Sequence, residues 1–97
     1  MNDYTLSTAA SRDLRNIARY SVRTFGRQQA RVYGDAFRDC FKAIAENPYM
    51  GQSQDLVRPG LRRLDLKRHS IYYIPHDDGV LVVRVLHYRQ DAWAHLK

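Results

Sequence analysis

Cysteine is nearly absent from this chain of 97 residues, in which Cys40 stands alone. One cysteine cannot form an internal disulfide, and its apolar neighbours at helical spacing favour a buried thiol over a nucleophile. Long hydrophobic runs are missing too, since the longest, Val80–Val83, is far shorter than the ~18 residues of a membrane span. The first residues have no basic start and no apolar core of a signal peptide. We therefore expect a cytoplasmic protein that makes no membrane contact.

Glycines are few and scattered, and they match no phosphate-binding fingerprint. The histidines have no paired spacing typical of metal ligands, either with one another or with the cysteine. No serine stands at a strand-to-helix elbow that would expose it as a nucleophile. The sequence thus predicts no cofactor and no metal site.

Acidic residues are also in short supply, with 10 Asp and Glu against 16 Lys and Arg and a net charge of +6. This surplus favours an acidic partner, which can be nucleic acid, the ribosome, a membrane surface or an acidic protein. The aromatic residues mostly fit core positions, so no stacking platform for bases stands out. The length suits one compact domain over residues 1–97.

Hydrophobic spacing predicts a short strand and then two helices. Residues Asp3–Leu6 alternate as a strand, and Ser7 offers an N-cap to a helix that ends at Gly26. A second helix spans Arg27–Glu46, and the short joint makes the pair an antiparallel hairpin. The apolar stripes comprise Ala10, Leu14, Ile17, Ala18, Val22 and Phe25 in the first helix, and Ala30, Tyr33, Phe37, Phe41 and Ile44 in the second.

Three antiparallel strands follow a polar loop over Tyr49–Gly60. They begin at about Leu61, and the strongest turn pattern is His76–Gly79, because Asp-Gly suits a two-residue hairpin loop. The expected fold is therefore α+β: an N-terminal strand, a two-helix hairpin, and a three-stranded meander in one sheet packed on the helices.

Placing Asp78 and Gly79 in the loop fixes a predicted register. It pairs Tyr72 with Val85, Ile74 with Val83 and His76 with Leu81 on a face that packs on the helices. It pairs Tyr73 with Arg84, Ile71 with Leu86 and His69 with Tyr88 on the other face. That second face is too apolar for a simply solvated surface, so we expect something to cover it.

The outer faces of the two helices differ in charge. On the second, Arg31 with Asp35, Asp35 with Arg38, Asp39 with Lys42 and Lys42 with Glu46 have spacings that allow ion pairs. On the first, four arginines form a stripe opposite the apolar side, with no acidic complement. This stripe is either a solvated face or a partner-binding edge, and we leave both open.

One cluster at the end of the last strand offers catalytic groups. Cleaving RNA without a metal needs a base, an acid and cations for the phosphate. His87 or His69, Tyr88, and Arg84 with Arg62 or Arg63 could fill these roles. No carboxylate or lysine is placed as a partner, and His-Tyr pairs at strand ends more often pack and cap, so we predict binding and not catalysis.

Several segments carry a family resemblance that covers nearly the whole chain. The segments YTLSTAASRDLRNIARYSVRTFG, RQQARVYGDAF, AENPYMG, VRPGLRRL, RHSIYY and VRVLHYRQD resemble, in order and spacing, the ParE toxins of bacterial type II toxin-antitoxin systems, within the RelE/ParE superfamily. The resemblance implies a non-enzymatic toxin that inhibits DNA gyrase by trapping it on cleaved DNA. It also implies a ParD-like antitoxin whose extended C-terminal segment wraps the toxin and which mainly makes the contacts to operator DNA.

One departure from the family pattern keeps an alternative open. ParE-like tails commonly have His-Gln-Arg-Met-Asp, whereas this strand ends His87-Tyr88-Arg89-Gln90-Asp91. The His-Tyr pair is similar to that of ribosome-dependent mRNA endoribonucleases of the RelE branch. We expect the gyrase contacts among Arg58, Arg62, Arg63, Arg84, His87, Tyr88, Arg89 and Trp93. We expect the antitoxin contacts among Arg12, Arg15, Arg19, Arg23, Ile71, Tyr73, Arg84 and Leu86.

Overall fold

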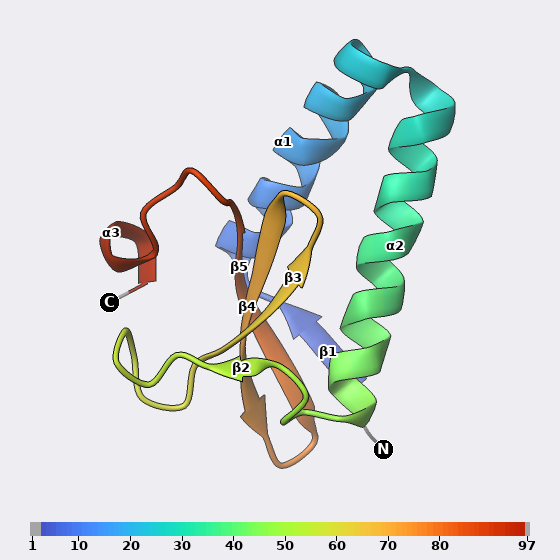
Figure 1. The fold of residues 1–97 in the computed structure, drawn as a ribbon. Helices are drawn as coiled ribbons and strands as arrows, with labels where there is room; N and C mark the ends of the chain where they lie inside the picture. Colours follow the sequence, from blue (N-terminus) through green and yellow to red (C-terminus); the bar gives the residue numbers. More distant parts are fainter. Residues whose placement is uncertain (1–2, 97) are drawn as a thin grey trace.

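The computed structural model describes residues 3–96 of the chain. Its elements are β1 (Asp3–Leu6), α1 (Thr8–Phe25), α2 (Arg27–Glu46), β2 (Gln52–Ser53), β3 (Arg62–Leu66), β4 (His69–His76), β5 (Gly79–His87) and α3 (Ala92–Leu96). The strands form one sheet in the order β1-β5-β4-β3-β2, and α1 and α2 run side by side along one of its faces (Figure 1). The predicted α+β class, helical hairpin and β3–β4–β5 meander are confirmed.

The ends of the helices follow the local sequence as predicted. The hydroxyl oxygen of Ser7 accepts a hydrogen bond from the amide of Ala10 at 2.9 Å, which is the contact of a helix N-cap. Gly26 takes a φ of 90°, a conformation that costs glycine little, and this lets α1 turn directly into α2. The second helix ends at Glu46, because Pro48 disfavours a helical conformation at Asn47.

The register predicted between β4 and β5 is wrong, because Gly79 belongs to the strand and not to the turn. His76 pairs with Gly79, so Asp77 and Asp78 make the loop. Gly79 lies against β1, where a Cβ atom would come within 2.8 Å of the Asp3 carbonyl carbon. The glycine is therefore needed for the close approach of β1, which pairs with β5 in parallel.

A β-bulge then shifts the register again between Tyr72 and Tyr73. Tyr73 pairs with Val82 and Tyr72 with Arg84, so Val83 is the extra residue on β5. The shift at the turn moves each partner by two positions, so it leaves the predicted groups of residues that share a face unchanged. Only the bulge regroups them, because it brings Val85 to the side of Ile71.

The helices pack on the face that we expected to be open, so our choice between the two faces is wrong. Ile71, Tyr73 and Val82 are fully buried there with Phe37 and Phe41 of α2. On the opposite face, Leu61, Tyr72 and Leu86 form a smaller cluster with Leu96 of α3. The chain thus covers part of its own second face with a helix that the sequence analysis missed.

The two elements that were not predicted are too short to show a periodic pattern. Strand β2, of two residues, lies inside the predicted loop and pairs with Arg62 and Arg63 of β3. Helix α3 has five residues and is held by the burial of Leu96. Both form through contacts with the sheet, because such short segments do not persist alone.

Where β1 stops pairing with β5, the side chains of Ser7 and of Asp13 in α1 make the next hydrogen bonds to β5. Ser7 donates its hydroxyl to the carbonyl of Val83 at 2.6 Å. Asp13 then accepts hydrogen bonds from the Val85 amide at 2.9 Å and from Nε and a terminal nitrogen of Arg84 at 2.8 and 2.9 Å. The pair is mostly buried, with 20% of the Arg84 side chain and 13% of the Asp13 side chain exposed.

We expect Asp13→Ala to destabilise the protein by about 3 kcal/mol, because it leaves a largely buried guanidinium and a strand amide without their partner. Urea unfolding followed by circular dichroism measures this change. The control is Asp39→Ala on the exposed face of α2, for which the expected loss stays below about 0.5 kcal/mol. Equal losses in the two variants would show that the Asp13 contacts add no stability.

Candidate functional site

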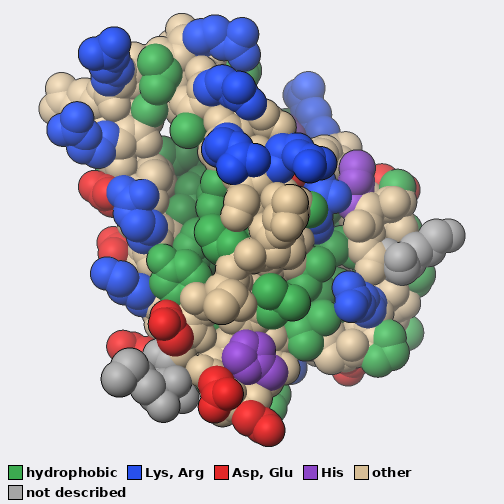
Figure 2. Space-filling model, turned by 180° about the vertical axis from the view of Figure 1, so that it is seen from behind, with side chains coloured by type: hydrophobic (Ala, Val, Ile, Leu, Met, Phe, Trp, Pro, Cys, Tyr) green, Lys and Arg blue, Asp and Glu red, His purple; other side chains and the backbone are tan. Residues whose placement is uncertain are grey.

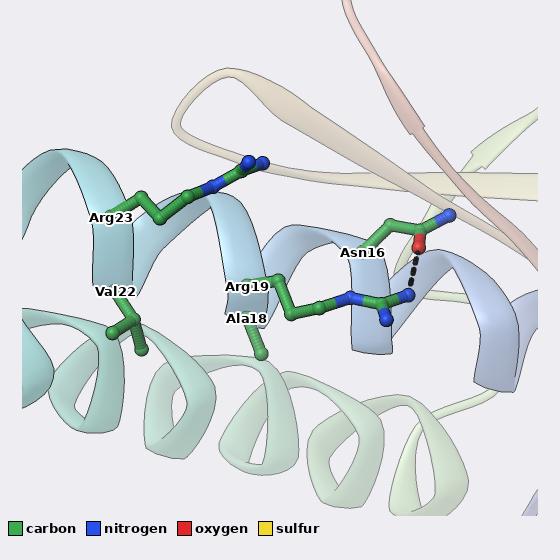
Figure 3. Close-up of a pocket in the computed structure, with 5 residues that line it drawn as sticks. All are labelled: Asn16, Ala18, Arg19, Val22 and Arg23. Carbon is green, nitrogen blue, oxygen red and sulfur yellow. Dashed lines mark hydrogen bonds between the residues drawn. The ribbon is translucent and has the colours of Figure 1, made fainter.

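The arginine stripe of α1 lies on its solvent side, as predicted. Arg12, Arg15, Arg19 and Arg23 are all exposed, and Arg19 donates a hydrogen bond to the side-chain oxygen of Asn16 at 2.7 Å. Figure 3 shows Arg19 and Arg23 reaching away from α2, whereas Ala18 and Val22 point toward it. The stripe therefore borders an apolar surface between the two helices.

A groove with a volume of about 140 Å³ runs between α1 and α2. Its small residues are Ala18 on α1 and Ala30 and Gly34 on α2, while Leu14 and Phe41 supply apolar surface deeper down. Figure 2, which shows the molecule from behind, displays hydrophobic side chains along the middle of this face with basic side chains on both sides. Arg38 lines the α2 side of the groove. An elongated apolar segment with acidic flanks would match this surface.

The apolar stripes of both helices continue past the end of the sheet, where nothing in the described chain covers them. Val22, Phe25 and Val32 are 41%, 64% and 57% exposed, although Val22 and Phe25 belong to the predicted core stripe. Figure 1 shows the cause, since the hairpin tip extends beyond the strands. Residues 12–31 hold six arginines and one aspartate, so this apolar end is also strongly basic.

Three of the predicted antitoxin contacts lie inside the protein. Ile71 and Tyr73 have no exposed surface and Leu86 is 1% exposed, so the interpretation that placed them on an open sheet face is wrong. Ile71 and Tyr73 lie on the face that packs on the helices, whereas Leu86 lies on the opposite face and is buried there with Leu96 of α3. Arg84, which we expected in both interfaces, is engaged by Asp13.

Most of the predicted gyrase contacts lie at two separate places on the surface. Arg58 is exposed in the loop before β3, and Arg63 contacts Asp65 and Gln52. Past the end of β5, Arg89 donates to the hydroxyl of Tyr88 at 3.0 Å and lies over its ring. Trp93 is half exposed on α3.

Arg62 holds the turn that links α2 to β2. Its Nε donates to the carbonyl of Gly51 at 2.9 Å and a terminal nitrogen donates to the carbonyl of Tyr49 at 3.2 Å. The guanidinium also lies over the Tyr49 ring, 5.2 Å from its centroid. Arg62 therefore stabilises the backbone of this turn.

The histidines that we predicted on opposite faces meet across the sheet. His69 pairs directly with His87, and their ring centroids are 5.3 Å apart. The predicted register puts His87 on the side of the helices and Tyr88 on the other face, which is wrong for this pair, because their ring centroids are 4.5 Å apart. Tyr33 of α2, which we expected only in the core, brings its hydroxyl to 2.7 Å from Nδ1 of His69.

Burial, and then the charge of His87, lower the pKa of His69. Burial also raises the pKa of Tyr33, so its phenol stays protonated. The Tyr33 hydroxyl lies 3.2 Å from the carbonyl oxygen of Leu66, to which it donates. A neutral His69 that donates its Nδ1 proton to Tyr33 satisfies both contacts.

The groups needed for metal-free RNA cleavage are not assembled around this histidine pair. Arg84 is bonded to Asp13, and Arg62 lies at the opposite end of β3 from Leu66, the partner of His69. Four residues of strand separate these ends by about 13 Å. Burial and Asp39 raise the pKa of the Cys40 thiol, which disfavours a reactive thiolate.

Within residues 3–96, no three His, Cys, Asp or Glu side chains are grouped as metal ligands require. None of the helices described in this range is long and apolar enough to cross a membrane.

The turn between α2 and β2 is a surface that the sequence analysis missed. Tyr49 and Met50 are 74% and 51% exposed in what we predicted to be a featureless polar loop. The useful indication was Asn47-Pro48 followed by Tyr, Met and Gly, a turn sequence with two large apolar residues in it.

Comparisons with known proteins agree on one family. A family model described as "ParE toxin of type II toxin-antitoxin system, parDE" matches residues 4–92. The chain is 38% identical over 96 residues to "Toxin ParE1" of Caulobacter vibrioides, with 99% of both chains covered. It is 36% identical to "Toxin ParE1" of Mycobacterium tuberculosis, with 92% of each covered, and 32% identical to "Toxin ParE" of Escherichia coli, with 99% and 94% covered.

A solved structure of a chromosomal ParDE TA system from P. aeruginosa has the same fold. It superposes with a TM-score of 0.75 over 90% of this chain and 96% of that one, at 21% identity.

The lowered pKa of His69 predicts that the protein loses stability in mild acid. The stability that this group contributes is present above the unfolded pKa of about 6.5 and is lost as pH falls through the folded pKa, because the unfolded chain binds the proton more readily. Chemical unfolding at a series of pH values measures the slope. We expect His69→Gln to flatten it below pH 6.5, and the exposed control His76→Gln to leave it as in the wild type. An unchanged slope in His69→Gln would contradict the assignment.

Proposed function

Since the chain belongs to the ParE toxin family of type II toxin-antitoxin systems, we propose that it inhibits DNA gyrase and is neutralised by a ParD-like antitoxin. The inhibition stabilises the cleaved DNA intermediate and blocks replication. The observation that carries the proposal is the family match over residues 4–92. It is supported by the apolar groove bordered by arginines, which suits an acidic partner segment.

The antitoxin is proposed to lie along the groove between α1 and α2. Small residues such as Ala18 and Gly34 allow a partner segment to approach the helix backbones closely, and the apolar floor gives affinity by burial. Arg15 and Arg19 on one side attract carboxylates, whereas Arg38 on the other side is already paired with Asp35. A second copy of this chain would bring two basic surfaces together, so the charge favours an acidic partner. Contact with operator DNA is then made through the antitoxin.

Gyrase inhibition is proposed to work by protein contact, with no catalytic step in this chain. The arginines that a ribonuclease would need lie apart from His87, and Arg84 is already bonded to a carboxylate. The relatives are named toxins. These features favour binding over catalysis.

The group of side chains around His87 supports a second candidate function, that of a RelE-like ribosome-dependent mRNA endoribonuclease. His69 and His87 pair at the ends of β4 and β5 and Tyr88 contacts His87, so groups that can act as acid and base are close to each other, with Arg89 next to Tyr88. The separation of the other arginines makes it the weaker candidate.

The two candidates differ in what fails first when the toxin is induced without antitoxin. Gyrase inhibition should give filamentous cells, DNA breaks and an SOS response while translation continues at first. With purified gyrase, ATP and relaxed plasmid, the toxin should inhibit supercoiling and increase the cleaved plasmid recovered after denaturation. Prompt arrest of translation with cut transcripts would support the endoribonuclease instead.

The groove predicts a charge-dependent affinity for the antitoxin. Reversing three charges of the stripe in Arg12→Glu/Arg15→Glu/Arg19→Glu should weaken binding by at least about tenfold at low salt, because attraction becomes repulsion. The control is Arg58→Glu, an exposed arginine away from the groove, which should change affinity less than about twofold. Calorimetric titration of toxin with antitoxin measures both, and unchanged affinity in the triple variant would make the stripe only a solvated face.

The apolar part of the groove is tested by filling it. Gly34→Leu should block the partner while stabilising α2, because leucine has the higher helix propensity and an added Cβ meets nothing closer than Arg38 at 3.9 Å. A rise in thermal stability with loss of antitoxin binding is the expected result. Full affinity in this variant would place the antitoxin elsewhere.

A further inference from the structure

The turn over residues 47–51, called here the 47–51 turn, is exposed and yet firmly held. Tyr49 and Met50 project from it with most of the Tyr49 surface and half of the Met50 surface exposed. Single exposed apolar residues are common on proteins and carry no meaning alone. The unusual feature is the number of fixed contacts beneath them.

A buried tyrosine fixes the backbone of the 47–51 turn from below. The hydroxyl of Tyr73, which has no exposed surface, donates to the carbonyl of Pro48 at 2.8 Å and accepts from the amide of Gly51 at 2.9 Å. Gly51 is packed so closely that a Cβ atom would lie within 2.9 Å of the Tyr73 ring. Both ends of the exposed dipeptide are thereby anchored in the core.

Arg62 fixes the same turn from the side. It donates to the carbonyls of Tyr49 and Gly51 and lies over the Tyr49 ring. The need of a buried Tyr73 for hydrogen-bond partners explains the contacts below the turn. It does not explain why an arginine should also hold an exposed aromatic ring in place.

We propose that the 47–51 turn is a preorganised knob, with Tyr49 and Met50 inserting into an apolar pocket of the toxin's target protein. Fixing a side chain before binding removes much of the entropy cost that binding otherwise carries. Tyrosine and arginine are the residue types that most often dominate binding energy, and methionine adapts to the shape of a pocket.

The local charge identifies the kind of partner. Residues 46–65 contain three basic and three acidic residues, so the knob stands on a neutral region of a basic protein. A polyanion such as DNA would prefer the arginine-rich hairpin, and so would the acidic antitoxin. A neutral apolar knob suits a protein pocket.

The knob also lies away from the antitoxin groove. It follows Glu46, the last residue of α2, whereas Gly34 and Phe41 of the groove are twelve and five residues earlier on this helix, about 18 and 8 Å along its axis. Figure 1 shows the 47–51 turn at the base of α2, at the far end from the hairpin tip. Changes to the knob should therefore separate target binding from antitoxin binding. The inference rests on the proposed function in taking gyrase as the target.

The test compares Tyr49→Ala/Met50→Ala with the wild type in gyrase supercoiling inhibition, growth arrest and antitoxin affinity. We expect at least about tenfold more of the double variant to be needed for half-inhibition, and weaker growth arrest. Antitoxin affinity should stay within about twofold. Leu56→Ala, which removes an even more exposed apolar side chain from the following loop without touching the turn, should behave as the wild type in every assay.

Each other outcome decides against the proposal or redirects it. Wild-type inhibition by the double variant overturns the knob. If the wild type arrests growth without inhibiting gyrase, gyrase is not the target. The knob is then judged by growth arrest: loss of arrest in the double variant supports the knob, and unchanged arrest overturns it. A wild type that does neither overturns both proposals.

A second variant guards against simple misfolding. Met50→Glu places a charge on a half-exposed side chain that the fold tolerates, but a charge is expensive in an apolar pocket. It should also lose gyrase inhibition by at least about tenfold while binding antitoxin normally. Loss of antitoxin affinity in both the double variant and Met50→Glu would assign the turn a folding role only, which overturns the docking proposal.

Discussion

The carboxylate of Asp13 joins the first helix to strand β5, and the placement of the helical hairpin and its groove depends on this contact. Strand β1 pairs with β5 only as far as Leu6 and Val82. Beyond that point Ser7 and Asp13 bond the groups of β5 that a longer strand would have paired, and Arg84 adds a charged partner. The start of α1 is thereby fixed at the sheet, and the later turns of the hairpin extend past it. Their apolar residues stay uncovered for this geometric reason.

The uneven distribution of charge gives the two ends of the molecule different surface chemistry. The hairpin carries most of the positive surplus next to an apolar groove, which suits an amphipathic acidic segment. The region around the 47–51 turn is neutral, and its exposed residues are held by Tyr73 and Arg62. These two surfaces differ in charge and lie apart, and we propose the first for the antitoxin and the second for the target.

Much of the fold was predictable because its determinants are local. The cap at Ser7, the positive φ of Gly26 and the stop at Pro48 each act within a few residues, so they gave the hairpin its boundaries. The arginine stripe followed from the helical period in the same way. The register of β4 with β5 could not be predicted in this way, because Gly79 is needed for the close approach of β1, a strand more than seventy residues earlier, and not for the local turn. Which face of β4 meets the helices was also decided by long-range packing, which places Ile71 and Tyr73 in the core, and the bulge at Val83 adds Val85 to the same side.

The sequence alone determined the fold class, the family, the two helices and the basic face of α1, because periodicity and capping are properties of neighbouring residues. The tertiary structure decided which sheet face meets the helices, that His69 and His87 meet while Arg84 turns to Asp13, and that Tyr49 stands on a fixed turn. These depend on contacts between residues far apart in the chain, where a shift of one position along a strand reverses the direction of every side chain.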